Sequence, residues 1–178
     1  WGSGRITITY STISNNYIRG AGGGLNNDGD SLYIANSTFS DNTATGIAGG
    51  LYNSSTAAAI VNTTFFGNQS GDRGGGLFND GNLTLTHVTF SGNRAASSGG
   101  GGIYNNWTFY PAVTLYNTIV ANSTNGADCV RGGPGPVVNG GGNLIEDGSC
   151  GFAVGGDPAL AALADNGGGT HTHALQPG

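Results

Sequence analysis

Two aspartates that could take part in acid–base chemistry recur at a regular interval, with a serine at the position between them. Asp28, Ser54 and Asp80 are 26 residues apart. Enzymes that cleave polysaccharides need clustered carboxylates, with a nearby base or a bound cation. Here the middle position is a serine, and each aspartate precedes a glycine, as is typical of turns. The pattern favours turn structure, so we predict no catalytic residue and no cofactor. A structural calcium ion is conceivable but not indicated.

The histidines form a second candidate group. His171 and His173 are two residues apart, so both imidazoles would lie on one face of a strand. Such a pair can bind a transition metal, but the neighbouring sequence offers no third ligand. His87 lies alone in a polar bend. We therefore expect structural or exposed histidines and no metal site.

These candidates belong to a chain with an internal repeat of about 26 residues. Five columns of like residues recur: Leu25, Leu51, Leu77 and Ile103; Asn27, Asn53, Asn79 and Asn105; Ile13, Phe39, Phe65, Phe90 and Ile119; Asn16, Asn42, Asn68, Asn93 and Asn122; and Ile8, Ile34, Ile60, Leu85 and Leu115. A repeat of this length must stack on its neighbours to bury its apolar face. Because apolar positions alternate between Gly and Asn bends, the repeat predicts strands.

The repeat predicts an all-β fold, a single-stranded parallel β-helix of five to six turns. Apolar columns would fill its bore, with Phe39, Phe65 and Phe90 in one stack flanked by Ile13 and Ile119. Stacked asparagine amides would hydrogen-bond along the axis. We expect one domain, with regular turns over residues 1–123. An irregular last turn and a capping or docking segment would occupy residues 124–178.

Composition excludes several functional classes. The 178 residues include five basic and ten acidic side chains, and the net charge of −5 argues against nucleic acid as a partner. No apolar run approaches the ~20 residues of a membrane-spanning helix. Cys129 and Cys150 lie outside the repeat, and we predict that they pair rather than remain two unrelated thiols. Low charge and a disulfide indicate an extracellular or cell-surface location.

A longer link between the fourth and fifth repeats groups three aromatic residues, Trp107, Phe109 and Tyr110. Such a cluster could stack on sugars or contact a partner, and it is the candidate recognition loop. The alternative is that the loop folds over the side of the next turn.

Seven Asn-x-Ser/Thr sequences occur, and each is a potential glycosylation signal in a secreted protein. Three of these asparagines, Asn53, Asn68 and Asn122, belong to the ladder columns and should point inward. The remaining four are candidate glycosylation sites: Asn36, Asn62, Asn82 and Asn106.

Two groups of motifs resemble known bacterial sequences. The paired GG-[LI] and FxxN motifs look like the repeats of polymorphic outer-membrane proteins. The stretch from Leu115 onward is similar to the choice-of-anchor Q domain, in the segments NTIVANSTNGADC, GGGNLIEDGSCG, DPALAALADNGG and THALQPG. The resemblance implies a right-handed β-helix on a secreted or surface-displayed protein, often followed by an anchor. It names no catalytic residue, and family members usually continue past the position of Gly178.

We therefore expect an architectural function, as a secreted structural protein, a filament subunit or an adhesin segment. Head-to-tail assembly would use the open edge at the start of the chain and the strand-like tail. The residues expected at these two ends are Arg5, Ile6, Ile8, Thr170, His171, His173 and Leu175. The alternative is a β-helix protein that binds or degrades carbohydrate, with surface glycans as partners.

Overall fold

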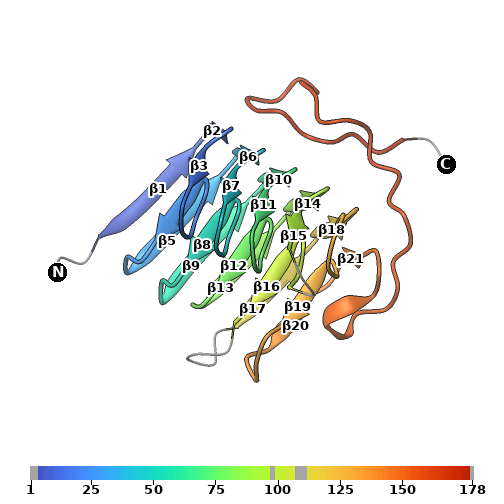
Figure 1. Ribbon diagram of the computed structural model, residues 1–178. Helices are drawn as coiled ribbons and strands as arrows, with labels where there is room; N and C mark the ends of the chain where they lie inside the picture. Colours follow the sequence, from blue (N-terminus) through green and yellow to red (C-terminus); the bar gives the residue numbers. More distant parts are fainter. Residues whose placement is uncertain (1–3, 97–98, 107–111, 177–178) are drawn as a thin grey trace.

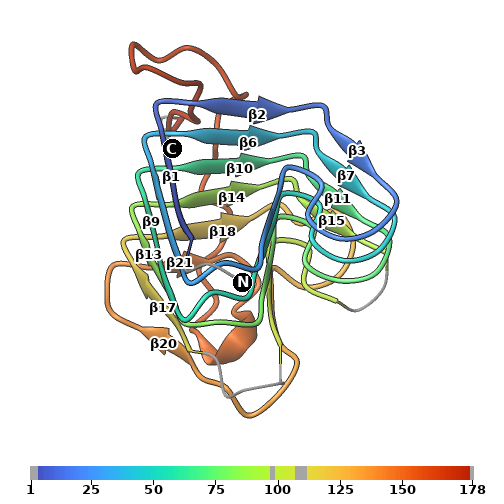
Figure 2. The ribbon, with the colours of Figure 1, turned by 90° about the vertical axis from the view of Figure 1, so that its left-hand side faces the viewer.

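The computed structural model of the protein describes residues 4–96, 99–106 and 112–176. It is an all-β solenoid of about five turns with a repeat of ~26 residues, which confirms the predicted parallel β-helix. Figure 1 shows the turns stacked along one axis, and Figure 2 views the stack from its first turn.

Each turn contributes one strand to each of several parallel sheets, which we name A to D. Sheet A contains β1 (Arg5–Thr9), β5 (Ser31–Ala35), β9 (Ala57–Val61), β13 (Leu83–Thr86), β17 (Val113–Tyr116) and β20 (Val137–Asn139). Sheet B contains β2 (Thr12–Ser14), β6 (Thr38–Ser40), β10 (Thr64–Phe66), β14 (Thr89–Ser91), β18 (Ile119–Ala121) and β21 (Leu144–Ile145). Sheet C contains β3 (Tyr17–Ile18), β7 (Thr43–Ala44), β11 (Gln69–Ser70) and β15 (Arg94–Ala95). Sheet D contains β4 (Leu25–Asn27), β8 (Leu51–Asn53), β12 (Leu77–Asn79), β16 (Ile103–Asn105) and β19 (Cys129–Arg131).

The corners between sheets A and B depend on residues that tolerate a left-handed backbone. Asn36, Asn62, His87 and Asn117 occupy this corner in successive turns, with φ between 45° and 54°. Asparagine adopts this conformation more readily than most residues. Consequently each turn can bend at the same place, which keeps the following strands in register.

The bore is filled by the predicted columns. Phe39, Phe65 and Phe90 are fully buried, and their ring centroids lie 5.0 and 4.7 Å apart. Asparagine side chains also stack as predicted: the Nδ2 of Asn68 donates to the Oδ1 of Asn93, and that of Asn53 donates to the Oδ1 of Asn79. These ladders satisfy buried amides by repetition between turns.

The fifth turn differs from the predicted register by one residue. Phe90 pairs with Val120, whereas Ile119 pairs with Thr89 and is only partly buried. Asn122, expected in the inner ladder, is exposed and has a φ of 58° at a corner. The prediction was wrong because the longer link before this turn shifts the repeat, and the adjacent Ile119 and Val120 fit either register by hydropathy.

The bore is covered differently at its two ends. After β21, the short 3-10 helix η1 (Ser149–Gly151) brings Cys150 and Phe152 against the core. In the first turn, Ile6, Ile8 and Leu25 are only partly buried. The end near residue 150 is therefore plugged by side chains, while the first turn presents apolar surface.

The C-terminal hairpin, residues 157–176, folds back over the outer face of sheet B (Figure 1). Its two arms are joined by antiparallel bridges, Leu160 to Leu175 and Ala164 to Thr172. This replaces the expected free, extended tail. Thr38 Oγ1 donates to the carbonyl of His171 at 2.7 Å, so the hairpin covers this side chain. Thr38 is buried, whereas Thr12 at the same position of the first turn is exposed.

Candidate functional site

One hollow on the outer surface is a groove across sheet A with a volume of about 610 Å³. It is lined by Arg5, Ser31, Leu32, Tyr33, Ala57, Ala58, Ala59, Asn82, Leu83, Thr84, Ala112 and Thr114. These residues come from the first five strands of the sheet and from the residues that precede them. The groove therefore runs along the solenoid axis, across the strands.

Local sequence explains the depth of the groove. Alternate residues of a strand point to opposite faces, and Ala57 and Ala59 point outward from β9. Ala59 lies between Tyr33 and Thr84 in the pairing register, and Ala57 pairs with Ser31. The third turn thus places methyl groups where its neighbours carry larger side chains. A run of three alanines was the sequence signal for this hollow, and sequence reasoning missed it.

The polar side chains of the groove have unused hydrogen-bonding capacity. Asn82 Oδ1 accepts from the backbone N–H of Ala112 at 3.1 Å. Among the described residues, the hydroxyls of Tyr33, Thr84 and Thr114 form no hydrogen bond, unlike the asparagines of the inner ladders. The groove can therefore offer several donors and acceptors to a ligand.

A second hollow, of about 630 Å³, lies beside the last turns. Asp128 and Asp147 line it and bond to each other. The backbone N–H of Asp128 donates to Asp147 Oδ2 at 3.0 Å, and that of Asp147 donates to Asp128 Oδ2 at 3.2 Å. Burial raises the pKa of Asp128. Burial acts on Asp147 too, but hydrogen bonds from Ser149 and from backbone N–H groups outweigh it and lower the pKa of that carboxyl. In the described ranges, no three His, Cys, Asp or Glu side chains are grouped to hold a metal ion.

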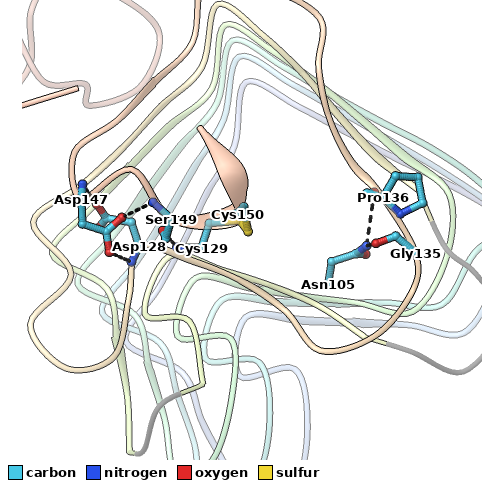
Figure 3. The surroundings of a disulfide bond; sticks show 8 residues. All are labelled: Asn105, Asp128, Cys129, Gly135, Pro136, Asp147, Ser149 and Cys150. Carbon is cyan, nitrogen blue, oxygen red and sulfur yellow. Dashed lines mark hydrogen bonds between the residues drawn. A yellow bond between two sulfur atoms is a disulfide. The ribbon is translucent and has the colours of Figure 1, made fainter. Parts of the chain in front are cut away.

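The predicted disulfide is confirmed. Cys129 and Cys150 are bonded, with their Cα atoms 5.5 Å apart, and Figure 3 shows that the bond adjoins the Asp128–Asp147 pair. The backbone N–H of Cys129 also donates to Ser149 Oγ at 2.9 Å. The bond therefore ties the plug at this end of the bore to β19.

Replacing Cys150 with serine should lower the free energy of unfolding by roughly 3 kcal/mol, because the bond joins residues that are 21 positions apart in the sequence. Urea denaturation of the wild type and of Cys150→Ser, each with and without reductant, measures this change. Reductant should destabilise the wild type and leave the variant unaffected. Equal stability of the oxidised and reduced wild type would contradict the prediction.

The other predicted polar sites are occupied by structural contacts. Ser54 Oγ donates to Asp28 Oδ1, and Asn106 Nδ2 donates to Asp80 Oδ1, which agrees with the turn interpretation of these aspartates. Burial, followed by the charges of Asp80 and Asp28, raises the pKa of the neighbouring Tyr52.

The two tail histidines make different contacts. His171 contributes its carbonyl to Thr38, while the ring of His173 lies against Phe66 with centroids 5.1 Å apart. His173 Nδ1 is 2.6 Å from the carbonyl of Ala161. The histidines therefore contribute to the attachment of the C-terminal hairpin.

The candidate glycosylation sites differ in exposure. Asn62 and Asn82 are exposed, Asn36 and Asn106 are partly buried, and Asn62 Nδ2 donates to Asn36 Oδ1 at 2.7 Å. Asn53 and Asn68 are fully buried, as predicted. The candidate recognition loop with Trp107, Phe109 and Tyr110 lies outside the described residues.

No helix in the part of the chain that the structure describes has the length and hydrophobicity to cross a membrane. Comparison of the chain with known proteins finds no matching protein family, no similar curated protein and no matching solved structure.

Proposed function

We propose that this chain is a structural segment of a secreted or cell-surface protein, a rigid β-helix that presents its outer faces to other molecules. The observation that carries the proposal is the continuous packing of the bore. Fully buried aromatic, aliphatic and asparagine columns pass through successive turns, and the two hollows lie on the outside. Such a solenoid offers an extended surface with little internal freedom.

Two further features support this proposal. The bond between Cys129 and Cys150 fits an oxidising, extracellular compartment. The likeness of the C-terminal segments to the choice-of-anchor Q domain, and of the repeats to polymorphic outer-membrane proteins, also favours surface display.

Display as an adhesin segment fits the structure better than a head-to-tail filament. The tail from Thr170 to Leu175 contacts its own sheet B and its own hairpin partner, and is not free to extend another copy. The plug formed by Cys150 and Phe152 also covers the end of the bore against which a following copy would stack.

Immunogold labelling with antibodies raised against the purified chain tests the location. We expect gold particles at the surface of the native cells or in the secreted material. Labelling confined to the cell interior would contradict the proposal.

The carbohydrate-degrading alternative is tested separately with the same purified chain. A panel of acidic and neutral polysaccharides should show no increase in reducing ends or unsaturated sugars over a heat-denatured control. Turnover that is lost on denaturation would overturn the structural proposal and favour an enzyme.

A further inference from the structure

The groove of sheet A cannot be filled by main-chain pairing. It lies on the face of the sheet, where β5, β9, β13 and β17 each pair with two neighbours, while the edge strand β1 contributes Arg5. A peptide that adds a strand needs an open sheet edge. The ligand of this groove must therefore be recognised by side chains.

The shape of the groove suits an extended polymer. Its lining begins at Arg5 beside the first turn and reaches Thr114 in the fifth strand of sheet A. Four strand spacings of about 4.8 Å give a length of roughly 19 Å, which exceeds a single sugar ring. Because the lining residues come from successive strands, a ligand in the groove would lie along the solenoid axis.

The lining has the chemistry for a sugar chain. The ring of Tyr33 and the methyl groups of Ala57 and Ala59 offer apolar surface for the C–H faces of sugars. Asn82, Thr84 and Thr114 lie beside these groups and can hydrogen-bond to hydroxyls. Small apolar patches between hydroxyl and amide groups match the alternating surface of a polysaccharide.

The charge of the groove lining indicates which kind of polysaccharide would fit. Arg5 is the one charged side chain among the lining residues, and no carboxylate lies among them. In the described part of the chain, Arg73 forms an ion pair with Asp72, whereas Arg5 forms none. The net charge of the chain is −5, but the lining carries none of its carboxylates, so the local charge at the groove comes from Arg5. A guanidinium without a carboxylate partner favours an anionic group on the ligand, because charge-assisted hydrogen bonds are stronger than neutral ones.

We propose that this groove binds an extended acidic polysaccharide built of uronic acid residues, with one carboxylate paired to Arg5. The proposal deepens the structural function above and rests on the extracellular location inferred there. The sugar chain lies across the strands of sheet A with its C–H faces on Tyr33, Ala57 and Ala59.

Isothermal titration calorimetry of the full chain tests the proposal. The probes are a galacturonate hexasaccharide and the same hexasaccharide after carboxyl reduction. The wild type should bind the acidic form about tenfold more tightly than the reduced form, as expected for one charge-assisted contact. Equal affinity for the two forms, or no binding of either, would overturn the proposal.

Three variants locate the site. Arg5→Gln should weaken binding of the acidic probe about tenfold and leave the reduced probe unaffected. Arg19→Gln, a matched control on an exposed arginine of the first turn that does not line the groove, should change neither. Ala59→Tyr fills the groove, and Tyr33 shows that this column accepts a tyrosine. It should weaken binding of both probes more than tenfold.

Other results would count against the groove. If Arg19→Gln matches Arg5→Gln, the binding is nonspecific attraction. If Ala59→Tyr binds like the wild type, the ligand lies elsewhere. Should Ala59→Tyr fail to fold by circular dichroism, Tyr33→Ala decides, because it must weaken both probes.

These results remain separate from the structural function. Absence of binding would leave the immunogold result intact. Cleavage of the bound hexasaccharide would support the groove while contradicting a purely structural role.

Discussion

Replacing Phe65 with alanine is expected to lower the free energy of unfolding by about 3–5 kcal/mol. Phe65 is fully buried at the middle of the aromatic stack, between Phe39 and Phe90. The substitution removes the ring from both contacts and leaves a cavity in a bore whose backbone is fixed by the turns on either side. Because the sheets hold the turns apart, the cavity has little opportunity to collapse.

Phe66→Ala provides a matched control for this experiment. Phe66 follows Phe65 directly but is only partly buried, and its ring contacts His173 of the C-terminal hairpin. Urea denaturation followed by circular dichroism should show a smaller loss for Phe66→Ala. A loss as large as that of Phe65→Ala would mean that the inner stack is not the main source of stability.

Asn68→Asp should also lower the free energy of unfolding by about 3–5 kcal/mol at neutral pH, although the side chain keeps its shape. The Nδ2 of Asn68 donates to the carbonyl of Phe39 at 2.9 Å and to Asn93 Oδ1 at 3.0 Å. A carboxylate cannot donate, so both acceptors lose a buried partner and face an uncompensated charge.

The loss of unfolding free energy caused by Asn68→Asp should be smaller at acidic pH. Burial raises the folded-state pKa of the introduced carboxyl above its unfolded value of about 3.9, so folding favours the protonated form. The variant is therefore least destabilised below about pH 4 and loses stability as the pH rises through the folded-state pKa. Asn62→Asp, in the exposed corner column, loses a solvent-exposed hydrogen bond to Asn36, so it should cost only about 1 kcal/mol and vary little across this range. A flat pH profile for Asn68→Asp would show that the ladder tolerates the charge.

The core of the solenoid could be predicted from sequence, because stacked turns place similar residues next to one another. Ile34, Ile60 and Leu85 share one column in the sequence and one ladder in sheet A. Prediction failed at Ile119 and Asn122, where a longer link changed the spacing and two adjacent apolar residues allowed either register. Periodicity fixes a column only while the repeat length is constant.

The outer surface was less predictable, because its features depend on size differences between side chains of neighbouring turns and not on the repeated pattern. At the groove, Ala59 is smaller than Tyr33 and Thr84 in the neighbouring strands, and Ala57 is smaller than Ser31. The fold-back of the C-terminal hairpin depends on contacts such as Thr38 to His171, which no local periodicity encodes.

The C-terminal hairpin also sets an order on folding. Neighbouring turns contact each other across about 26 residues, so the solenoid can begin at any turn and grow in either direction. The bonds from Thr38 to His171 and from Thr170 to Asn36 span 133 and 134 residues. These long-range hydrogen bonds can form only after the strands between the two partners have stacked and brought them together. The hairpin is therefore expected to dock last, and its attachment reports that the turns beneath it are complete and in register.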